Sequence, residues 1–152
     1  MSARARLAVM TDDVFPDPST PFGQRVQRRL RDEQVIWLTT VGADGTPQPN
    51  PVWFVVDGRI AVVYNRSDAR RLGHIRRNPR VALHLDGDGR GGDVIVLTGT
   101  AEIAADQPLA HEFPPYLAKY RQAAERVSGK VDEFSADYSV ALRITIDRVR
   151  GF

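Results

Sequence analysis

Residues 46–58 have the sequence TPQPNPVWFVVDG, and this stretch is the most informative about the fold of the chain. Val52 to Val56 are β-branched or aromatic and favour extended backbone, whereas every second residue from 47 to 51 is a proline without a backbone N–H. Such a stretch has to lie at the edge of a sheet, with its unpaired side turned away from other strands. Asp57-Gly58 then favours a two-residue hairpin turn. We therefore predict an edge strand over Thr46–Asp57, followed by a hairpin.

Alternating and β-branched stretches on both sides of this segment predict further strands, and three stretches have helical spacing. The order is helix, three strands, helix, two strands, helix and strand. Because consecutive strands are joined by tight turns, they should pair antiparallel, and six such strands can close into a barrel. The predicted strands are Val35–Val41, Thr46–Asp57, Arg59–Asn65, Arg80–Asp86, Asp93–Ile103 and Tyr138–Val149. The predicted helices are Phe22–Gln34, Asp68–Asn78 with Ser67 as its cap, and residues 106–128.

Length and composition limit the class of protein. The 152 residues suit one domain, and we expect an irregular leader over residues 1–20 before a folded domain over residues 21–152. No window holds the ~18 apolar residues that a membrane span needs, and the N-terminus lacks the apolar core of a secretory signal. We therefore expect a cytoplasmic protein without membrane contact.

Several kinds of chemistry are excluded by residues that the chain lacks. Without cysteine there are no disulfides, thiolate metal sites or cysteine nucleophiles. The three histidines show no metal-ligand spacing, and no nucleophile motif is present. We predict no metal and assign no catalytic side chain, so that a cofactor and a small-molecule substrate would have to carry any reaction.

Residues 65–80, NRSDARRLGHIRRNPR, place six arginines at the junction of a predicted strand and helix. Backbone N–H groups at a helix start and guanidinium groups both suit a phosphate. A solvated basic face explains the same residues, and both interpretations stay open. Nucleic acid binding rests on this basic character alone, since acidic residues nearly balance the basic ones and no recognition motif is present. We expect no nucleic acid partner.

Two other features admit either a ligand or a purely structural role. Trp53 and Phe54 offer flat apolar surface to a planar heterocycle, but large aromatic side chains also fill barrel interiors. The turn at residues 87–93, GDGRGGD, lets backbone approach a ligand closely. It lacks the spacing of a phosphate-binding loop and precedes a strand, so a hairpin turn without a ligand is the simpler interpretation.

Several motifs occur together along the chain: Pro47-x-Pro49-x-Pro51-Val52-Trp53-Phe54, Asp57-Gly58, Val63-Tyr64-Asn65, Arg71-Leu72-x-x-Ile75-Arg76-x-Asn78-Pro79-Arg80-Val81-Ala82-Leu83 and Arg148-Val149-Arg150-Gly151-Phe152. Together they resemble the pyridoxamine 5′-phosphate oxidase-like split barrels, most of all the actinobacterial branch that uses the deazaflavin coenzyme F420. The resemblance implies an α+β split β-barrel that forms a homodimer. It also implies hydride transfer between F420 and an unsaturated or quinone-like molecule. Related branches leave two alternatives open: an FMN-dependent oxidoreductase, or a non-catalytic carrier of F420 or heme.

The resemblance also implies where the cofactor binds. Its ring is expected along the second strand, against Val52, Trp53, Phe54, Val55 and Val56. Tyr64 and Asn65 would border its phosphate. Arg71, flanked by Arg70 and Leu72, occupies a position where the family usually has a phosphate-binding lysine, and a guanidinium keeps that charge with a different geometry. The turn comprising Gly91, Gly92, Asp93 and Val94 would come from the second subunit.

Overall fold

The computed structural model describes residues 14–152, so most of the predicted leader lies outside the described residues. Residues 14–20 form turns and bends that lead into helix α2 (Pro21–Asp32). The Thr20 side chain caps this helix by accepting a hydrogen bond from the Gly23 backbone N–H at 3.0 Å. Val26 and Leu30 are buried in the same core as the strands, which confirms the apolar face predicted for this helix.

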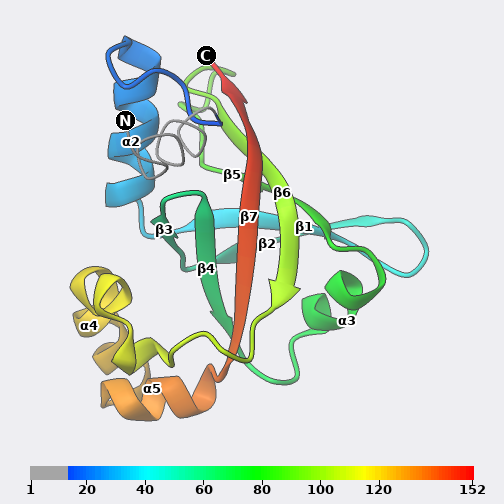
Figure 1. Ribbon diagram of the computed structural model, residues 1–152, viewed down its shortest axis with the longest axis vertical. Coiled ribbons are helices and arrows are strands. Elements are labelled where there is room, and N and C mark those ends of the chain that lie inside the picture. The colour runs from blue at the N-terminus through cyan, green and yellow to red at the C-terminus, as the bar shows by residue number, and fades with distance from the viewer. Residues whose placement is uncertain (1–13) are drawn as a thin grey trace, which may run out of the picture.

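The described residues form one curled antiparallel sheet in the order β2-β1-β5-β6-β7-β4-β3. Figure 1 shows β1 and β2 crossing behind β4, β7 and β6, so that the sheet wraps around its own core. The pairing of β6 with β7 shifts register between Thr98 and Gly99. The strands are β1 (Ile36–Val41), β2 (Pro47–Val52), β3 (Val55–Asp57), β4 (Ile60–Asn65), β5 (Arg80–His84), β6 (Ile95–Ile103) and β7 (Val140–Gly151).

The two edge strands, β2 and β3, follow each other in the chain and are separated only by Trp53 and Phe54. The prediction of one strand over Thr46–Asp57 is therefore wrong, and the described sheet has seven strands rather than six. The break is held by a long-range contact, because the backbone N–H and C=O of Phe54 lie 2.9 and 3.0 Å from the Tyr120 hydroxyl. The predicted α+β split barrel of antiparallel strands with flanking helices is otherwise confirmed.

The alternating prolines put β2 at an edge of the sheet, as the sequence predicts. On its paired side, Asn50 lies opposite Leu38 and Val52 opposite Ile36, both in β1. Because successive backbone groups point to opposite sides of a strand, the prolines at 47, 49 and 51 fall together on the side without a neighbour. That outer edge presents carbonyl oxygens but offers no N–H donors to a further strand.

The remaining elements are helices α3 (Arg70–Arg77), α4 (Pro114–Ser128) and α5 (Val131–Asp137), with a short 3-10 turn, η1 (Ala110–Glu112), before α4. Helix α3 buries Leu72 and Ile75, as predicted, but it begins after Ala69, so the expected cap by Ser67 is wrong. The helix predicted for residues 106–128 corresponds to η1 and α4. Helix α5 was not expected, because seven residues are too few to show a clear helical period.

Buried residues form two clusters on opposite sides of the Trp53–Phe54 break. Phe54 belongs to the largely aliphatic cluster inside the barrel. Trp53 packs against the second, aromatic cluster, which is built around Tyr116, Tyr120 and Phe134 of helices α4 and α5. Neighbouring residues of an extended chain point to opposite sides, so the break presents one aromatic residue to each cluster. No helix within residues 14–152 is long and apolar enough to cross a membrane.

Candidate functional site

A cavity of about 360 Å³ lies beside Trp53, where the edge strand β2 meets helices α3, α4 and α5. Most of its wall is aromatic, Arg71 is its one charged lining residue among the described residues, and no carboxylate lines it. We call it the Arg71 cavity. It brings together four residues that the resemblance assigned to the cofactor. The full lining is Val35, Pro51, Val52, Trp53, Tyr64, Arg71, Tyr116, Val127, Phe134 and Tyr138.

The aromatic wall of the Arg71 cavity is a set of rings that hold one another in place. The Trp53 ring is stacked on Tyr120 at 5.0 Å and 6°, and on Phe134 at 5.5 Å and 16°. Phe134 in turn stacks on Tyr138 at 4.6 Å, and Tyr64 meets Tyr116 edge-on at 4.9 Å. Such contacts stabilise by ~0.5–1.5 kcal/mol each beyond the buried area. The wall is therefore flat and fixed, as a planar ligand requires.

Arg71 lies at the second position of α3 and is half-buried. Its Nε donates a hydrogen bond to Asn65 Oδ1 at 2.6 Å. Asn65 is fully buried, and its Nδ2 donates to the carbonyl oxygens of Val63 and Val140, both at 3.0 Å. Those two bonds use both amide hydrogens, so the Asn65 oxygen has to face Arg71.

Arg71 is a cation held by a neutral partner. Within residues 14–152 no carboxylate lies within ion-pair distance of its guanidinium, and burial lowers its pKa. A guanidinium nevertheless keeps its charge at neutral pH. Because Nε is committed to Asn65, the two terminal nitrogens are the groups left to bind a ligand. A half-buried guanidinium without an acidic partner is suited to an anion such as a phosphate.

Two tyrosines in the cavity differ in what their hydroxyl groups can do. The Tyr64 hydroxyl donates to the Pro108 carbonyl oxygen at 2.6 Å and is therefore committed. The Tyr116 ring is buried, and its hydroxyl has no hydrogen-bond partner in the described part of the chain. Burial raises the pKa of Tyr116 well above its ordinary value, so the phenol stays neutral. Tyr116 can donate a hydrogen bond to a ligand, but it does not act as a base.

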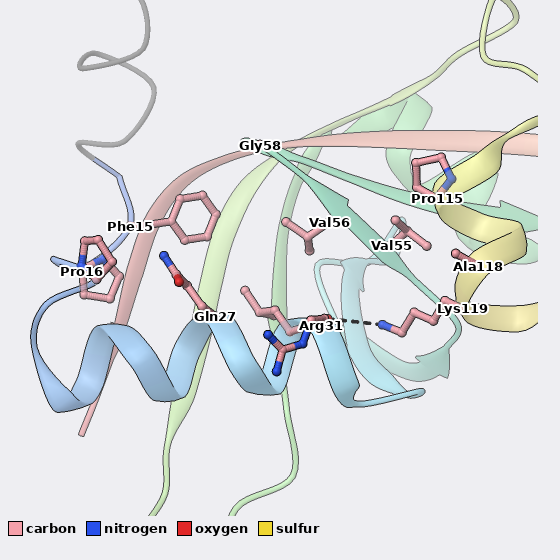
Figure 2. Close-up of a pocket in the computed structure, with 12 residues that line it drawn as sticks. Phe15, Pro16, Gln27, Arg31, Val55, Val56, Gly58, Pro115, Ala118 and Lys119 are labelled. Atoms are coloured by element: carbon pink, nitrogen blue, oxygen red, sulfur yellow. Dashed lines mark hydrogen bonds between the residues drawn. The ribbon is translucent and has the colours of Figure 1, made fainter.

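Other residues of the predicted site lie outside the Arg71 cavity. Phe54 and Leu72 are buried in the barrel core, and Arg70 is exposed. Val55 and Val56 line a different cavity, of about 580 Å³, which includes neither Trp53 nor Arg71 (Figure 2). The break that divides the predicted strand therefore also divides the predicted cofactor wall.

The turn comprising Gly91, Gly92, Asp93 and Val94 does not reach the Arg71 cavity within one chain. Asp93, the acidic residue of this turn, forms ion pairs with Arg25 at 3.1 Å and Arg29 at 3.2 Å, both on α2. Val94 exchanges backbone hydrogen bonds with Phe152. The turn is thus anchored to α2 and to the end of the chain. Its expected contribution from a second subunit stays a prediction.

Three aromatic residues of the cavity were not anticipated: Tyr116, Phe134 and Tyr138. A signal was present in the sequence, because Tyr116 and Tyr120 are four residues apart, as are Phe134 and Tyr138, which places each pair on one helix face. The predicted residues and these three now define a site with an aromatic wall and one cation.

The family model for pyridoxamine 5′-phosphate oxidase matches residues 22–152. The chain belongs to this family. A comparison with curated proteins gave no significant match.

Solved structures share the family's split barrel. One described as an F420 reductase is 25% identical, with a TM-score of 0.60, over 82% of this chain and 94% of that chain. The heme storage protein HutZ of Vibrio cholerae is 16% identical, with a TM-score of 0.62, over 87% and 95%. General Stress Protein 26 of Bacillus anthracis is 21% identical, with a TM-score of 0.62, over 83% and 89%. The last two likenesses show the fold alone.

Proposed function

We propose that the protein binds coenzyme F420 in the Arg71 cavity and transfers a hydride between it and an unsaturated or quinone-like small molecule. The observation that carries this proposal is the half-buried Arg71 guanidinium, which has only the neutral Asn65 as a partner and lies beside an aromatic wall. Family membership and the 25% identity to an F420 reductase support it.

The cavity fits a ligand that combines a phosphate with a planar ring. Arg71 would hold the phosphate through its terminal nitrogens. The wall that contains Trp53 and Phe134 would lie against the ring. When bound, the cofactor supplies the hydride chemistry at its ring. The residues of the chain position the cofactor and exclude water, while the neutral Tyr116 hydroxyl donates a hydrogen bond to cofactor or substrate.

FMN is the main alternative, because it also carries a phosphate and a tricyclic ring. What favours F420 is its acidic oligoglutamate tail. Arg70, Arg76 and Arg77 are exposed on α3 beside the cavity and form no ion pair among the described residues. Three cations next to Arg71 give such a tail charged partners that FMN does not need.

A heme carrier is less well supported, because no histidine lines the Arg71 cavity within the described residues. His74 Nδ1 lies 2.8 Å from Thr40 Oγ1, and His111 Nδ1 lies 2.8 Å from Ser135 Oγ. We extend the proposal to a homodimer, in which the Gly91–Val94 turn of a second copy completes each site. Sedimentation as a monomer at all concentrations would contradict this extension.

The decisive experiment is equilibrium binding of F420 and, separately, of FMN, followed by fluorescence. Loss of a hydrogen-bonded charge costs ~1.5–3 kcal/mol, so Arg71→Ala should weaken F420 binding roughly 10- to 150-fold. Arg121→Ala is the matched control, because Arg121 is exposed on α4 and lies outside the cavity lining and away from the α3 arginines; we expect a change of less than about threefold. Oxidation of reduced F420 by a quinone panel then tests turnover.

Each alternative result has a definite meaning. Tighter binding of FMN than of F420 would indicate that the protein is a flavin-dependent member of the family. Equal losses in the Arg71 and Arg121 variants would show that the cavity does not select the phosphate. Binding of neither cofactor would overturn the proposal.

A further inference from the structure

The larger cavity, of about 580 Å³, lies between helix α2, strand β3 and helix α4. In Figure 2, Val56 lies across the space from Phe15, Val55 lies beside α4, and Lys119 enters from α4. Apolar groups make up most of the wall, which also includes Pro115 and Ala118. Among residues 14–152, the lining contains two cations, Arg31 and Lys119, and no acidic residue. We call it the Lys119 cavity.

Lys119 is held by backbone oxygens rather than by a carboxylate. Its Nζ donates to Leu30 O at 3.2 Å and to Phe54 O at 3.1 Å, and lies 3.7 Å from the centroid of the Phe54 ring. An ammonium group has three N–H donors. The third has no oxygen acceptor among the described residues.

The neighbouring acids at the end of α2 already have partners. Asp32 pairs with Arg31 at 2.8 Å, and Glu33 pairs with Arg29 at 3.1 Å. Lys119 is therefore the cation of this cavity that has no ion pair within residues 14–152. It combines an apolar enclosure, one positive charge without a carboxylate partner and one N–H that has the Phe54 ring, but no oxygen acceptor, beside it.

We propose that the Lys119 cavity is a second binding site, which takes a small molecule with an apolar body and a single carboxylate. The carboxylate would accept the unused Lys119 hydrogen and balance its charge. The body would lie against Phe15, Val56 and Pro115. A neutral molecule would leave the cation unmatched, and a dianion would find no second unpaired cation. The site is separate from the Arg71 cavity, and this proposal does not rest on the proposed F420 function.

Binding at this site should depend on pH. Burial lowers the pKa of Lys119 to about 8, against the opposing attraction of Asp32 and Glu33. Arg31 keeps its charge throughout this range. A carboxylate next to the ammonium raises the pKa again, so binding above pH 8 takes up a proton. Between about pH 6 and 7, where the carboxylate is ionised, the affinity should be constant, and it should fall as the pH rises past about 8.

The test is calorimetric titration of the full chain with decanoate, and with decanol as an uncharged control of the same length. We expect one decanoate per chain and at least tenfold weaker binding of decanol. Lys119→Met should remove the preference for decanoate. The matched control is Lys130→Met, because Lys130 is the other lysine of the sequence and is exposed; it should bind as the wild type does.

A second pair of variants keeps the test decisive if Lys119→Met fails to fold. Ala118 is exposed on α4 and lines the cavity, so Ala118→Trp should fill the space and weaken decanoate binding at least tenfold. Gln122→Trp, one turn further along, is the control and should leave binding unchanged. No decanoate binding, equal binding of decanol, or full binding by Ala118→Trp would overturn the proposal. If the Lys119 amine becomes protected from chemical modification as the protein concentration rises, whether or not decanoate is present, the cavity is covered by a second copy of the chain. That result would also overturn the proposal.

Discussion

Replacing Tyr120 by phenylalanine tests what holds the break between β2 and β3. The Tyr120 hydroxyl accepts the Phe54 backbone N–H at 2.9 Å and donates to the Gln34 carbonyl oxygen at 2.6 Å. The substitution removes one oxygen atom and leaves the ring stacked on Trp53 at 5.0 Å. Its effect therefore reports the hydrogen bonds and not the aromatic packing.

The expected cost follows from the groups that lose a partner. The Phe54 N–H is buried and would be left unsatisfied, which costs ~1–3 kcal/mol. The Gln34 carbonyl belongs to an exposed residue that water can reach, so its lost bond adds only ~1 kcal/mol. The Phe54 carbonyl keeps Lys119 as a donor. We expect the free energy of unfolding to fall by about 2–4 kcal/mol, and the melting temperature by roughly 5–15 °C.

Urea unfolding followed by tryptophan fluorescence measures this loss, and an unchanged m-value would show that the same transition is compared. Tyr116→Phe is the matched control on the same helix. Tyr116 is equally buried, but its hydroxyl has no partner among the described residues, so this variant should stay within ~0.5 kcal/mol of the wild type. If Tyr120→Phe is no less stable than Tyr116→Phe, the hydroxyl does not hold the break and the reasoning is wrong.

Two further predictions can be checked by the same unfolding measurement. Gly99→Ala should lower the free energy of unfolding by more than ~2 kcal/mol, because the new Cβ would lie 2.3 Å from the Thr145 backbone oxygen. Gly73 has open space around it in α3, so Gly73→Ala should raise the free energy of unfolding by ~0.5–1 kcal/mol. A stable Gly99→Ala protein would contradict the close packing of β6 on β7. Burial lowers the Lys119 pKa from 10.5 to about 8, so the unfolded chain holds a proton that the folded chain has lost between these values. The unfolding free energy of the wild type should therefore rise with pH over that range relative to Lys119→Met, and a flat or falling difference would contradict the lowered pKa.

Local patterns predicted most of the fold, because the determinants lie within a few residues of one another. Alternation located the strands, and the prolines before Val52 identified the edge correctly. The division of that strand was missed. Its cause is Tyr120, which bonds Phe54 from 66 residues away. No local pattern encodes that contact, and residues on both sides of the break are individually suited to a strand.

The candidate site was predicted in part for a similar reason. The family resemblance grouped Val52, Trp53, Tyr64 and Arg71, although β2 and β4 are not neighbours in the sheet. The contact between Arg71 and Asn65 links residues only six positions apart. The aromatic contribution of α4 and α5 depends on how two helices dock on the sheet, which a single sequence does not specify. The role proposed for the Gly91–Val94 turn requires a second copy of the chain.

Adjacent residues of α4 connect the two cavities. Lys119 holds the Phe54 carbonyl from one side, and Tyr120 holds the Phe54 N–H while its ring supports Trp53. Trp53 faces the Arg71 cavity, whereas Lys119 lines the other one. A carboxylate that draws Lys119 toward itself therefore weakens one of the contacts on the peptide next to Trp53. Because any such coupling is reciprocal, a ligand against Trp53 would change the affinity at Lys119 by the same factor. The break in the strand thus allows one short stretch of backbone to form part of both cavity walls.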